Sequence, residues 1–168
     1  MIRFTIIIPH KNIPDLLQRM LNSIPKRNDV QVIVVDDNSD PSIVDFEHFP
    51  GLNNPNTEVY FTKEGRGAGY ARNVGLKYAK GEWLLFADAD DVFCETAVES
   101  FKALENIDAD LVYFNVESRD SCTLEQNTEA DYQNEICERM LQGDFSLKYH
   151  HEVPWGKAIK RDLVMKNC

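Results

Sequence analysis

The sequence predicts an α/β protein with three layers, in which helices cover both faces of a mostly parallel central sheet. Apolar runs rich in β-branched residues alternate along the chain with segments of helical periodicity. The runs are too continuous for strands with one face in water, so they indicate strands that are buried on both faces. With 168 residues, the chain is long enough for one domain with a sizeable core and short for two.

Several segments have the composition of buried strands. The first two, RFTIIIP and VQVIVVD, are almost entirely apolar and rich in isoleucine and valine. The third follows a turn rich in proline and asparagine at residues 50–56. The expected strands are residues 3–9, 30–36, 57–62, 82–87 and 110–116.

Helical patterns occupy the segments between these strands and after them. Apolar residues recur at helical spacing after Asn12, a candidate N-cap, and Pro14 falls in the first turn, where proline is tolerated. A glycine-rich turn at residues 65–69 leads into the second helix, and Gly81 stands where a C-terminal cap is expected. The expected helices are residues 13–24, 70–79, 95–106, 131–142 and 161–168.

The charge and the cysteines exclude several classes of function. A net charge of −10 argues against a nucleic acid bound through its phosphate backbone. No apolar stretch approaches the ~18 residues of a membrane span, and no basic and apolar leader opens the sequence. The four cysteines are widely spaced, which predicts free thiols in a reducing cytoplasm rather than metal ligands.

Polar residues follow three of the expected strands at their carboxyl ends, which is where open parallel sheets bind ligands. The first strand ends in PHKN, the second in DDNSD and the fourth in DADD. If the sheet is parallel, these three groups crowd one edge of the molecule. An acidic pair, an amide-rich turn and three carboxylates at one edge suit a nucleotide diphosphate bridged by a metal ion.

The DADD motif is the most informative of the three. Two carboxylates ~5 Å apart repel by roughly 3 kcal/mol at an effective dielectric constant of ~20, and a divalent cation removes this cost. Oxygen ligands favour Mg²⁺ or Mn²⁺, with Asp88 and Asp90 as candidate ligands and Asp37 as an acceptor for a base or ribose. In the alternative interpretation, the acids only cap the next helix, and the DDNS segment is an Asx-turn, which we favour for Asn38 and Ser39.

In their order, these motifs resemble the family 2 glycosyltransferases, which transfer a sugar from a nucleotide diphosphate sugar with inversion and have the GT-A, Rossmann-like fold of nucleotide-diphospho-sugar transferases. The resemblance runs over nearly the whole chain. The matching elements are P-x-x-N at 9–12, V-V-D-D-x-S at 34–39, G-x-G-x-A-R-N-x-G-L at 67–76, GEWLLFADADD at 81–91 and W-x-K-x-x-K-R at 155–161.

The resemblance implies roles for individual residues. Pro9 and its neighbours would line the base pocket, Asp37 would contact the nucleobase, and Asp88 the ribose or a metal-bound water. Asp90, with Asp88, would bind Mn²⁺ or Mg²⁺, while Asp91 would cap the following helix. The expected nucleotide-sugar-binding residues are Pro9, His10, Asp37, Arg72, Asp88 and Ala89.

Other residues have two interpretations. Arg72 contacts phosphate or carboxylates near the donor, or forms a structural ion pair, and Asn73 and Gly75 serve helix packing. The basic residues of the last motif approach the pyrophosphate or form a solvated patch, and the two adjacent histidines face the acceptor cleft or the solvent. These residues are Lys157, Lys160, Arg161, His150 and His151.

The resemblance implies a single displacement at the anomeric carbon, with a carboxylate as the base that deprotonates the acceptor. That base lies downstream of the W-x-K element in the family, whereas this chain stops at Cys168, seven residues past Arg161. We therefore expect no catalytic base in this chain, a nucleotide-sugar-binding core at 1–116 and a truncated start of the acceptor side at 117–168. The whole is expected to form one compact domain.

The resemblance further implies a UDP-sugar as donor and a saccharide or lipid-linked acceptor, which suggests a cytoplasmic protein that works near the inner face of a membrane. The main alternative is a nucleotide-diphosphate-binding module without catalysis. The DADD motif also fits haloacid dehalogenase-type phosphatases, but their motif follows the first strand. An EF-hand is disfavoured because Phe93 stands where that loop needs glycine, and a dinucleotide site because Tyr70 replaces its last glycine.

Overall fold

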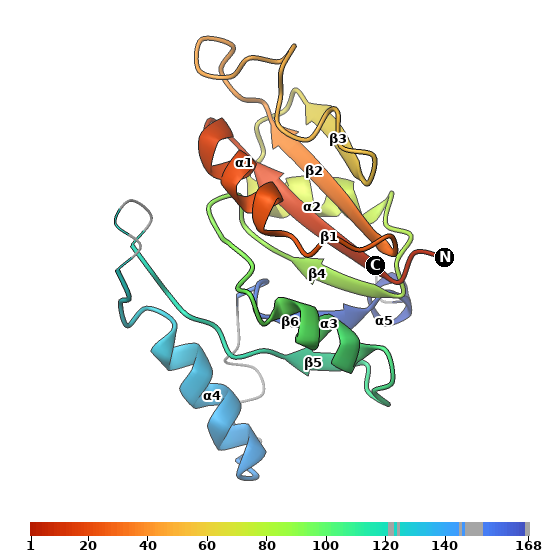
Figure 1. The fold of residues 1–168 in the computed structure, drawn as a ribbon, viewed down its shortest axis with the longest axis vertical. Helices are drawn as coiled ribbons and strands as arrows, with labels where there is room; N and C mark the ends of the chain where they lie inside the picture. The colour runs from red at the N-terminus through yellow and green to blue at the C-terminus, as the bar shows by residue number, and fades with distance from the viewer. Residues whose placement is uncertain (121–122, 124, 145, 147–152, 167–168) are drawn as a thin grey trace.

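One mixed sheet of six strands forms the centre of the molecule (Figure 1). The computed structural model describes residues 1–120, 123, 125–144, 146 and 153–166. The strands are β1 (Phe4–His10), β2 (Val30–Asp37), β3 (Thr57–Thr62), β4 (Trp83–Phe86), β5 (Leu111–Tyr113) and β6 (Lys157–Lys160). They lie in the order β3-β2-β1-β4-β6-β5. The part expected to bind the donor, residues 1–116, and the part expected to begin the acceptor side, residues 117–168, therefore both contribute strands to this sheet.

The four strands β1 to β4 are parallel, as the sequence predicts. The other edge of the sheet differs from the prediction. The strand expected at 110–116 is reduced to Leu111–Tyr113, and it pairs antiparallel with β6, which itself runs antiparallel to β4. The sequence did not indicate β6, because its four residues KAIK show neither a long apolar run nor an extended alternation.

Helices cover both faces of the sheet, which confirms the three-layer prediction. The helices are α1 (Pro14–Ser23), α2 (Ala68–Leu76), α3 (Ala97–Leu104), α4 (Asp131–Leu141) and α5 (Arg161–Met165). In Figure 1, α1 and α3 lie in front of the sheet and α2 lies behind it. The front core contains apolar residues of α1 and α3, and the smaller rear core contains Ala71 of α2.

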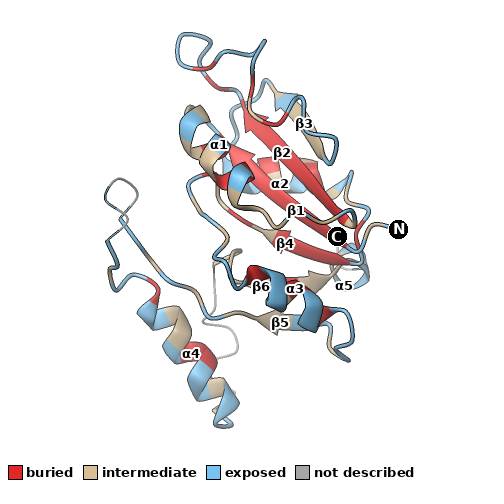
Figure 2. Cartoon of the chain, viewed as in Figure 1, coloured by how far each residue is buried: buried red, intermediate tan, exposed pale blue. Residues whose placement is uncertain are grey.

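The burial of the central strands explains their continuous apolar sequences. In β1, Phe4, Ile6 and Ile8 point into the front core, while Ile7 points into the rear core against α2. Figure 2 shows β1, β2 and β4 buried along most of their length, while the edge strands β3 and β5 are partly exposed. A strand with a core on each face has no position for a solvated side chain, so its polar–apolar alternation disappears.

Two glycines allow close contact with β1. Gly75 of α2 is buried, and a Cβ atom there would lie 2.6 Å from Cγ2 of Ile7, so this helix packs on the sheet through a glycine, as predicted. The prediction for Asn73 is wrong, because that residue is exposed. Gly81 does not cap a helix, since α2 ends at Leu76. Its Cβ would instead lie 2.5 Å from the backbone of Phe4, and its N–H donates to Thr5 Oγ1 at 2.8 Å.

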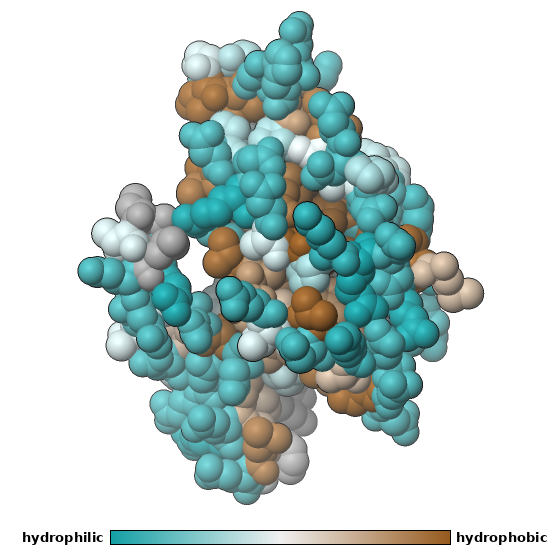
Figure 3. Space-filling view, viewed as in Figure 1, coloured by the Kyte–Doolittle hydropathy of each residue, from teal (hydrophilic) through white to brown (hydrophobic). Residues whose placement is uncertain are grey.

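The surface agrees with the acidic, polar composition. The face seen in Figure 3 is largely hydrophilic, and its hydrophobic residues are scattered over small patches. Within the described residues, none of the helices combines the length and the apolar character needed to cross a bilayer. Cys94 and Cys137 are free cysteines, as predicted, while Cys122 and Cys168 lie outside the described residues.

Candidate functional site

The polar carboxyl ends of β1, β2 and β4 meet at one edge of the sheet, as the sequence predicts. In the register of the sheet, His10 at the end of β1 pairs with Asp36 of β2, and Ile7 pairs with Phe86 at the end of β4. Residues Asp88–Asp91, called the acidic turn below, follow β4 after the single residue Ala87. The edge therefore brings together residues from three separate parts of the chain.

A buried network joins the ends of β1 and β2. His10 Nδ1 lies 2.8 Å from Asp36 Oδ2, and the Ser39 hydroxyl donates to the same oxygen. The Ser39 N–H donates to Asp36 Oδ1 at 3.0 Å, which is the Asx-turn predicted for this segment. Burial raises the pKa of Asp36, but the hydrogen bonds from His10 and Ser39 outweigh it and hold this pKa below its ordinary value.

Both ring nitrogens of His10 have partners within the chain. The Ile13 N–H donates to His10 Nε2 at 3.2 Å. Nδ1 faces the Asp36 carboxylate. His10 is 2 % exposed, and its ring meets Phe49 edge-on at 5.1 Å. Both ring nitrogens are thus engaged within the chain, beneath the edge at which a ligand would lie.

Asn12 does not cap α1, contrary to the prediction. The N-cap position of α1 is Ile13, without a side-chain cap. Asn12 instead adopts a positive φ of 60°, and its side-chain oxygen accepts the Asp40 N–H at 2.8 Å. Its own N–H donates to Ser39 Oγ at 2.8 Å. The residue therefore locks the loop after β1 to the loop after β2.

Asp37 holds the glycine-rich turn. Its carboxylate accepts the N–H groups of Arg66 at 3.1 Å and Gly67 at 2.6 Å, and the Thr62 hydroxyl at 3.2 Å. The residue is 2 % exposed. Gly65 and Gly67 have φ values of 61° and 90°, a region that side chains disfavour, which explains why glycines occupy this turn. Asp37 thus fixes the shape of the loop that leads into α2.

Arg72 and Asp88 form an ion pair between α2 and the acidic turn. The structure places Arg72 against a carboxylate of the candidate site, and its contact with phosphate stays a prediction. The side chain of Arg72 is 17 % exposed and that of Asp88 34 % exposed. The guanidinium therefore offsets part of the negative charge at the end of β4 from the rear face of the sheet.

The acidic turn is closed by its own last residue. The Asp88 N–H donates to Asp91 Oδ2 at 2.9 Å, and the Asp91 N–H donates to the Asp88 carbonyl at 3.1 Å. Asp91 therefore does not cap the next helix, which begins at Ala97. Burial, together with the charges of Asp88 and Asp90, raises the pKa of Asp91 to about 6, although the Asp88 N–H and Arg72 act in the opposite direction.

The acidic turn offers two carboxylates to a cation, those of Asp88 and of the exposed Asp90. Among the described residues, no group of three His, Cys, Asp or Glu side chains is arranged around a common metal position. Mg²⁺ is usually bound by one or two carboxylates together with substrate phosphates rather than by a cage of protein ligands. The donor set fits a divalent ion whose remaining ligands come from a diphosphate.

The other predicted nucleotide-sugar residues lie at the same edge. Pro9 is buried in β1 opposite Val35, and Ala89 is 2 % exposed within the acidic turn. Either residue can therefore meet a ligand only through its backbone or a small exposed part of its side chain.

The basic residues of the W-x-K-x-x-K-R motif divide between the two ends of the sheet. Lys160 pairs with Trp83 at the start of β4, where its ammonium contacts Glu82 and the Trp83 ring. Arg161 donates to the carbonyls of Ala79 and Lys80. Both lie at the end of β4 remote from the acidic turn, so the prediction that they approach the pyrophosphate is wrong.

Lys157 lies at the other end of β6, in register with Tyr113, and its ammonium is 5.7 Å from that ring. Burial lowers its pKa, while the neighbouring Cys137 acts in the opposite direction. The histidines His150 and His151 lie outside the described residues.

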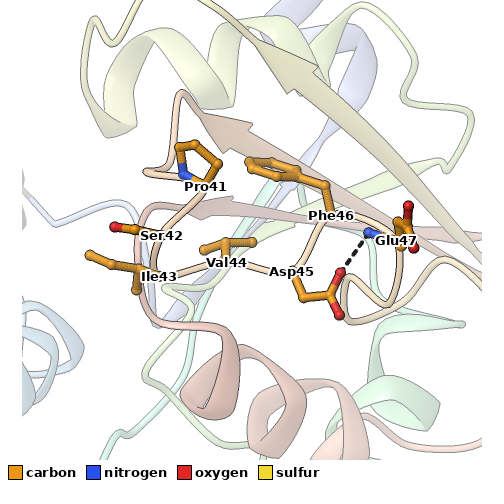
Figure 4. A pocket seen from close by; sticks show the side chains of 7 residues that line it. All are labelled: Pro41, Ser42, Ile43, Val44, Asp45, Phe46 and Glu47. Carbon is orange, nitrogen blue, oxygen red and sulfur yellow. Dashed lines mark hydrogen bonds between the residues drawn. The ribbon is translucent and has the colours of Figure 1, made fainter.

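The loop after β2 forms a shallow hollow of its own (Figure 4). Its lining is Pro41, Ser42, Ile43, Val44, Asp45, Phe46 and Glu47. Asp45 accepts the Glu47 N–H at 2.9 Å, so the loop is closed by local hydrogen bonds. None of the residues predicted for the site lines this hollow.

Sequence comparison finds similar bacterial proteins that are named as glycosyltransferases or as a teichoic acid biosynthesis protein. The chain is 35 % identical over 96 residues to the poly(ribitol-phosphate) β-N-acetylglucosaminyltransferase TarS of Staphylococcus aureus, a match that covers 54 % of this chain and 17 % of that protein. It is 34 % identical over 102 residues to the minor teichoic acid biosynthesis protein GgaB of Bacillus subtilis, covering 58 % and 11 %. The glycosyltransferase YibD of Escherichia coli is 26 % identical over 180 residues, covering 98 % and 50 %. The chain spans half or less of the length of these relatives.

Solved structures show the same fold. The structure of S. aureus TarS 1–349 in complex with UDP-GlcNAc superposes with a TM-score of 0.72 at 24 % identity, over 99 % of this chain and 47 % of that one. The mannosyltransferase PcManGT from Pyrobaculum calidifontis, in complex with GDP-Man and Mn²⁺, gives a TM-score of 0.65 at 22 % identity, over 98 % and 46 %. These likenesses establish the GT-A fold of nucleotide-sugar transferases, as predicted.

The family assignment rests on the whole of the chain rather than on any one motif. The model of "Glycosyl transferase family 2" matches residues 5–167, a range that contains every polar group gathered at the carboxyl edge of the sheet. This edge is where ligands of open parallel sheets bind. The chain belongs to glycosyl transferase family 2.

Proposed function

We propose that this chain binds a UDP-sugar together with Mn²⁺ or Mg²⁺ at the carboxyl edge of the sheet, for transfer of the sugar with inversion to a saccharide or lipid-linked acceptor. The observation that supports this most strongly is the acidic turn beside the ends of β1 and β2. It offers two carboxylates that have no third protein ligand among the residues that the structure describes, which suits an ion shared with a diphosphate. The relatives named for UDP-GlcNAc binding and teichoic acid synthesis favour a UDP donor and a saccharide acceptor.

Each residue takes its role from its position. Asp37 and the backbone of Pro9 would flank the base, with Asp37 also shaping the glycine-rich turn. Asp88 and Ala89 would lie near the ribose, and Asp90 would hold the ion. Because both nitrogens of His10 are engaged inside the chain, we assign it a supporting role through Asp36 rather than a direct contact.

The chemistry follows from the charge on the leaving group. A divalent ion, when bound, would neutralise the charge that develops on the departing diphosphate. Arg72 lies against Asp88 and would hold that carboxylate in place while the donor binds. In this proposal, residues 1–116 bind the donor, and residues 117–168 begin the acceptor side. The base that deprotonates the acceptor is not among the residues assigned here.

Calorimetric titration tests the donor proposal. UDP is titrated into the purified chain with Mn²⁺ and then with excess EDTA, and GDP and CDP are titrated in parallel. We expect UDP to bind with Mn²⁺ at least about tenfold more tightly than with EDTA, and more tightly than GDP or CDP. The Asp90→Asn variant should lose the gain from Mn²⁺, and Asp108→Asn, in the exposed turn between α3 and β5, serves as the matched control.

An assay of sugar transfer and hydrolysis with a UDP-sugar, run beside the titration, separates the main alternative. A nucleotide-binding module without catalysis would bind UDP in this way but would neither transfer nor hydrolyse the sugar of a UDP-sugar. Absence of UDP binding by the folded chain under both conditions would refute the donor proposal. Trapping of a covalent aspartyl-phosphate at Asp88 would instead favour the phosphatase interpretation, which the GT-A fold argues against.

A further inference from the structure

Helix α1 contacts the chain on both sides of Asp91 through two residues on one of its faces. Arg19 and Ser23 are four positions apart, so their side chains lie one above the other on the helix. Arg19 Nη2 donates to the Asp90 carbonyl at 2.8 Å. Ser23 Oγ accepts the Phe93 N–H at 2.9 Å. Each hydrogen bond joins residues about seventy positions apart in the chain, so neither contact follows from local structure.

The Ser23 hydroxyl is oriented for this contact. It donates to the Met20 carbonyl at 2.7 Å, which directs a lone pair toward the Phe93 N–H. Phe93 also packs on the front core, with its ring 6.0 Å from that of Phe101. The chain just after the acidic turn is thus fixed at Phe93, both by its backbone hydrogen bond and by the packing of its ring.

Both contacts from α1 go to backbone atoms and use no carboxylate oxygen. This matters because the carboxylates of Asp88, Asp90 and Asp91 lie within one short turn and repel one another, so an unsupported turn would relax by spreading them apart. On the opposite face of the sheet, Arg72 of α2 pairs with the Asp88 side chain. The turn is therefore held from both helical layers while the carboxylate of Asp90 stays available.

We propose that Arg19 and Ser23 are positioning residues of the donor site, which hold the acidic turn in the arrangement that takes up a divalent cation with a nucleotide diphosphate. The inference rests on the proposed function and names two residues on a helix that contributes no predicted ligand. Groups that support metal ligands commonly contribute 10–100-fold to metal affinity, although they do not touch the ion.

Because Arg19 is positively charged, Arg19→Met has two opposing effects on Mn²⁺-dependent binding. The sign of the measured change shows which of them is larger. Removing a cation that contacts the backbone of the acidic turn strengthens the attraction of that turn for Mn²⁺, so the electrostatic effect of Arg19→Met alone is tighter metal-dependent binding. Loss of the hydrogen bond to the Asp90 carbonyl acts in the opposite direction. Ser23→Ala removes the other contact with no change of charge, and Arg19→Lys keeps the charge and a donor.

The test measures UDP affinity by calorimetry with Mn²⁺ and with EDTA, and amide hydrogen exchange of residues 88–93 in the ligand-free protein. We expect Ser23→Ala and Arg19→Met each to reduce the gain in affinity from Mn²⁺ by about tenfold, with unchanged affinity in EDTA. Arg19→Lys should recover part of the gain. Exchange should rise at residues 88–93 and stay unchanged in β1 and β2. Gln18→Met, at the exposed neighbouring position of α1, is the control.

Three results would overturn the inference. The first is an unchanged or larger gain from Mn²⁺ in Arg19→Met and Ser23→Ala. The second is an equal loss of affinity with Mn²⁺ and EDTA together with faster exchange throughout the sheet, which would mean that the residues only stabilise the fold. The third is a wild-type protein that gains nothing from Mn²⁺, which would refute the proposed function itself before any variant is compared.

Discussion

Arg72 on α2 and Asp88 at the end of β4 form an ion pair at the edge of the sheet where the polar ends of three strands meet. The Arg72 guanidinium offsets the charge of one of the three carboxylates of the acidic turn, that of Asp88. The Asp91 carboxylate accepts a hydrogen bond from the Asp88 N–H inside the turn. Burial of Asp91, together with the neighbouring charges of Asp88 and Asp90, favours its protonation and raises its pKa to about 6.

Asp91 makes the stability of the protein depend on pH. Its pKa is about 6 in the folded protein and near its ordinary value of about 4 when unfolded. Between these two values, the folded state binds more protons than the unfolded state, so this residue's contribution to stability is lost as the pH rises from about 4 to 6. At pH 7.5 the ionised carboxylate costs roughly 3 kcal/mol.

Asp91→Asn should therefore stabilise the protein at pH 7.5 and change its stability little at pH 4. The amide oxygen still accepts the Asp88 N–H, and the expected gain of about 1–3 kcal/mol corresponds to a rise in Tm of about 3–10 °C. Thermal unfolding of both proteins at the two pH values measures this, with Asp108→Asn as the control. A variant that is less stable than the wild type at pH 7.5 would contradict the assignment.

Gly75 is predicted to be intolerant of even one added carbon. An alanine in a helix is ordinarily better than glycine by about 1 kcal/mol. In Gly75→Ala, however, the Cβ atom would lie 2.6 Å from Cγ2 of Ile7 and 3.4 Å from Cγ2 of Ile33. Because overpacking costs about 1–3 kcal/mol, we expect net destabilisation of roughly 1 kcal/mol or more in urea unfolding.

Gly69 provides the matched control on the same helix. No atom lies within 4 Å of the position of its Cβ, so Gly69→Ala should leave the stability unchanged or raise it by up to about 1 kcal/mol. If both variants were equally stable, α2 would not pack on β1 as closely as the structure indicates.

Asp37→Asn tests how the glycine-rich turn is held. The asparagine keeps one acceptor oxygen but presents an NH₂ group to a backbone N–H donor of Arg66 or Gly67. A partly buried N–H that loses a charged acceptor costs about 1–2 kcal/mol, and amides in the turn should exchange faster. Urea unfolding and hydrogen exchange measure the two effects.

Asp37→Asn should also differ from Asp90→Asn in its effect on UDP. If Asp37 shapes the base side of the site, its variant weakens UDP with Mn²⁺ and with EDTA by the same factor. Asp90→Asn should weaken UDP only with Mn²⁺. An identical metal-dependent loss in both variants would contradict the separate roles of the two residues.

The sequence predicts the part of the fold that depends on long apolar runs. The four parallel strands and the helices on both faces follow from such runs and from helical periodicity, because burial on two faces leaves a clear pattern. The antiparallel edge of the sheet does not follow from such patterns. The four residues of β6 form a strand because they pair with β4 and β5, while their own sequence, KAIK, shows no strand pattern.

The site is predicted less completely, for a geometrical reason. Asp88 and Asp90 stand out because their motif follows a strand, and Arg72 because its motif resembles a family. His10 and Asp36 are bonded because they share a register position, which no local pattern shows. Arg19 likewise meets the acidic turn only through the packing of α1 on the sheet, and the sequence alone shows an ordinary polar position of an amphipathic helix.

The most direct test of the account is a crystal structure of the chain with UDP and Mn²⁺, in which the anomalous scattering of manganese locates the ion. The account predicts a manganese peak within coordination distance of the Asp90 carboxylate and of the diphosphate, with the uracil beside Asp37. UDP bound at this edge without manganese at the acidic turn, or UDP and manganese bound elsewhere on the protein, would contradict it.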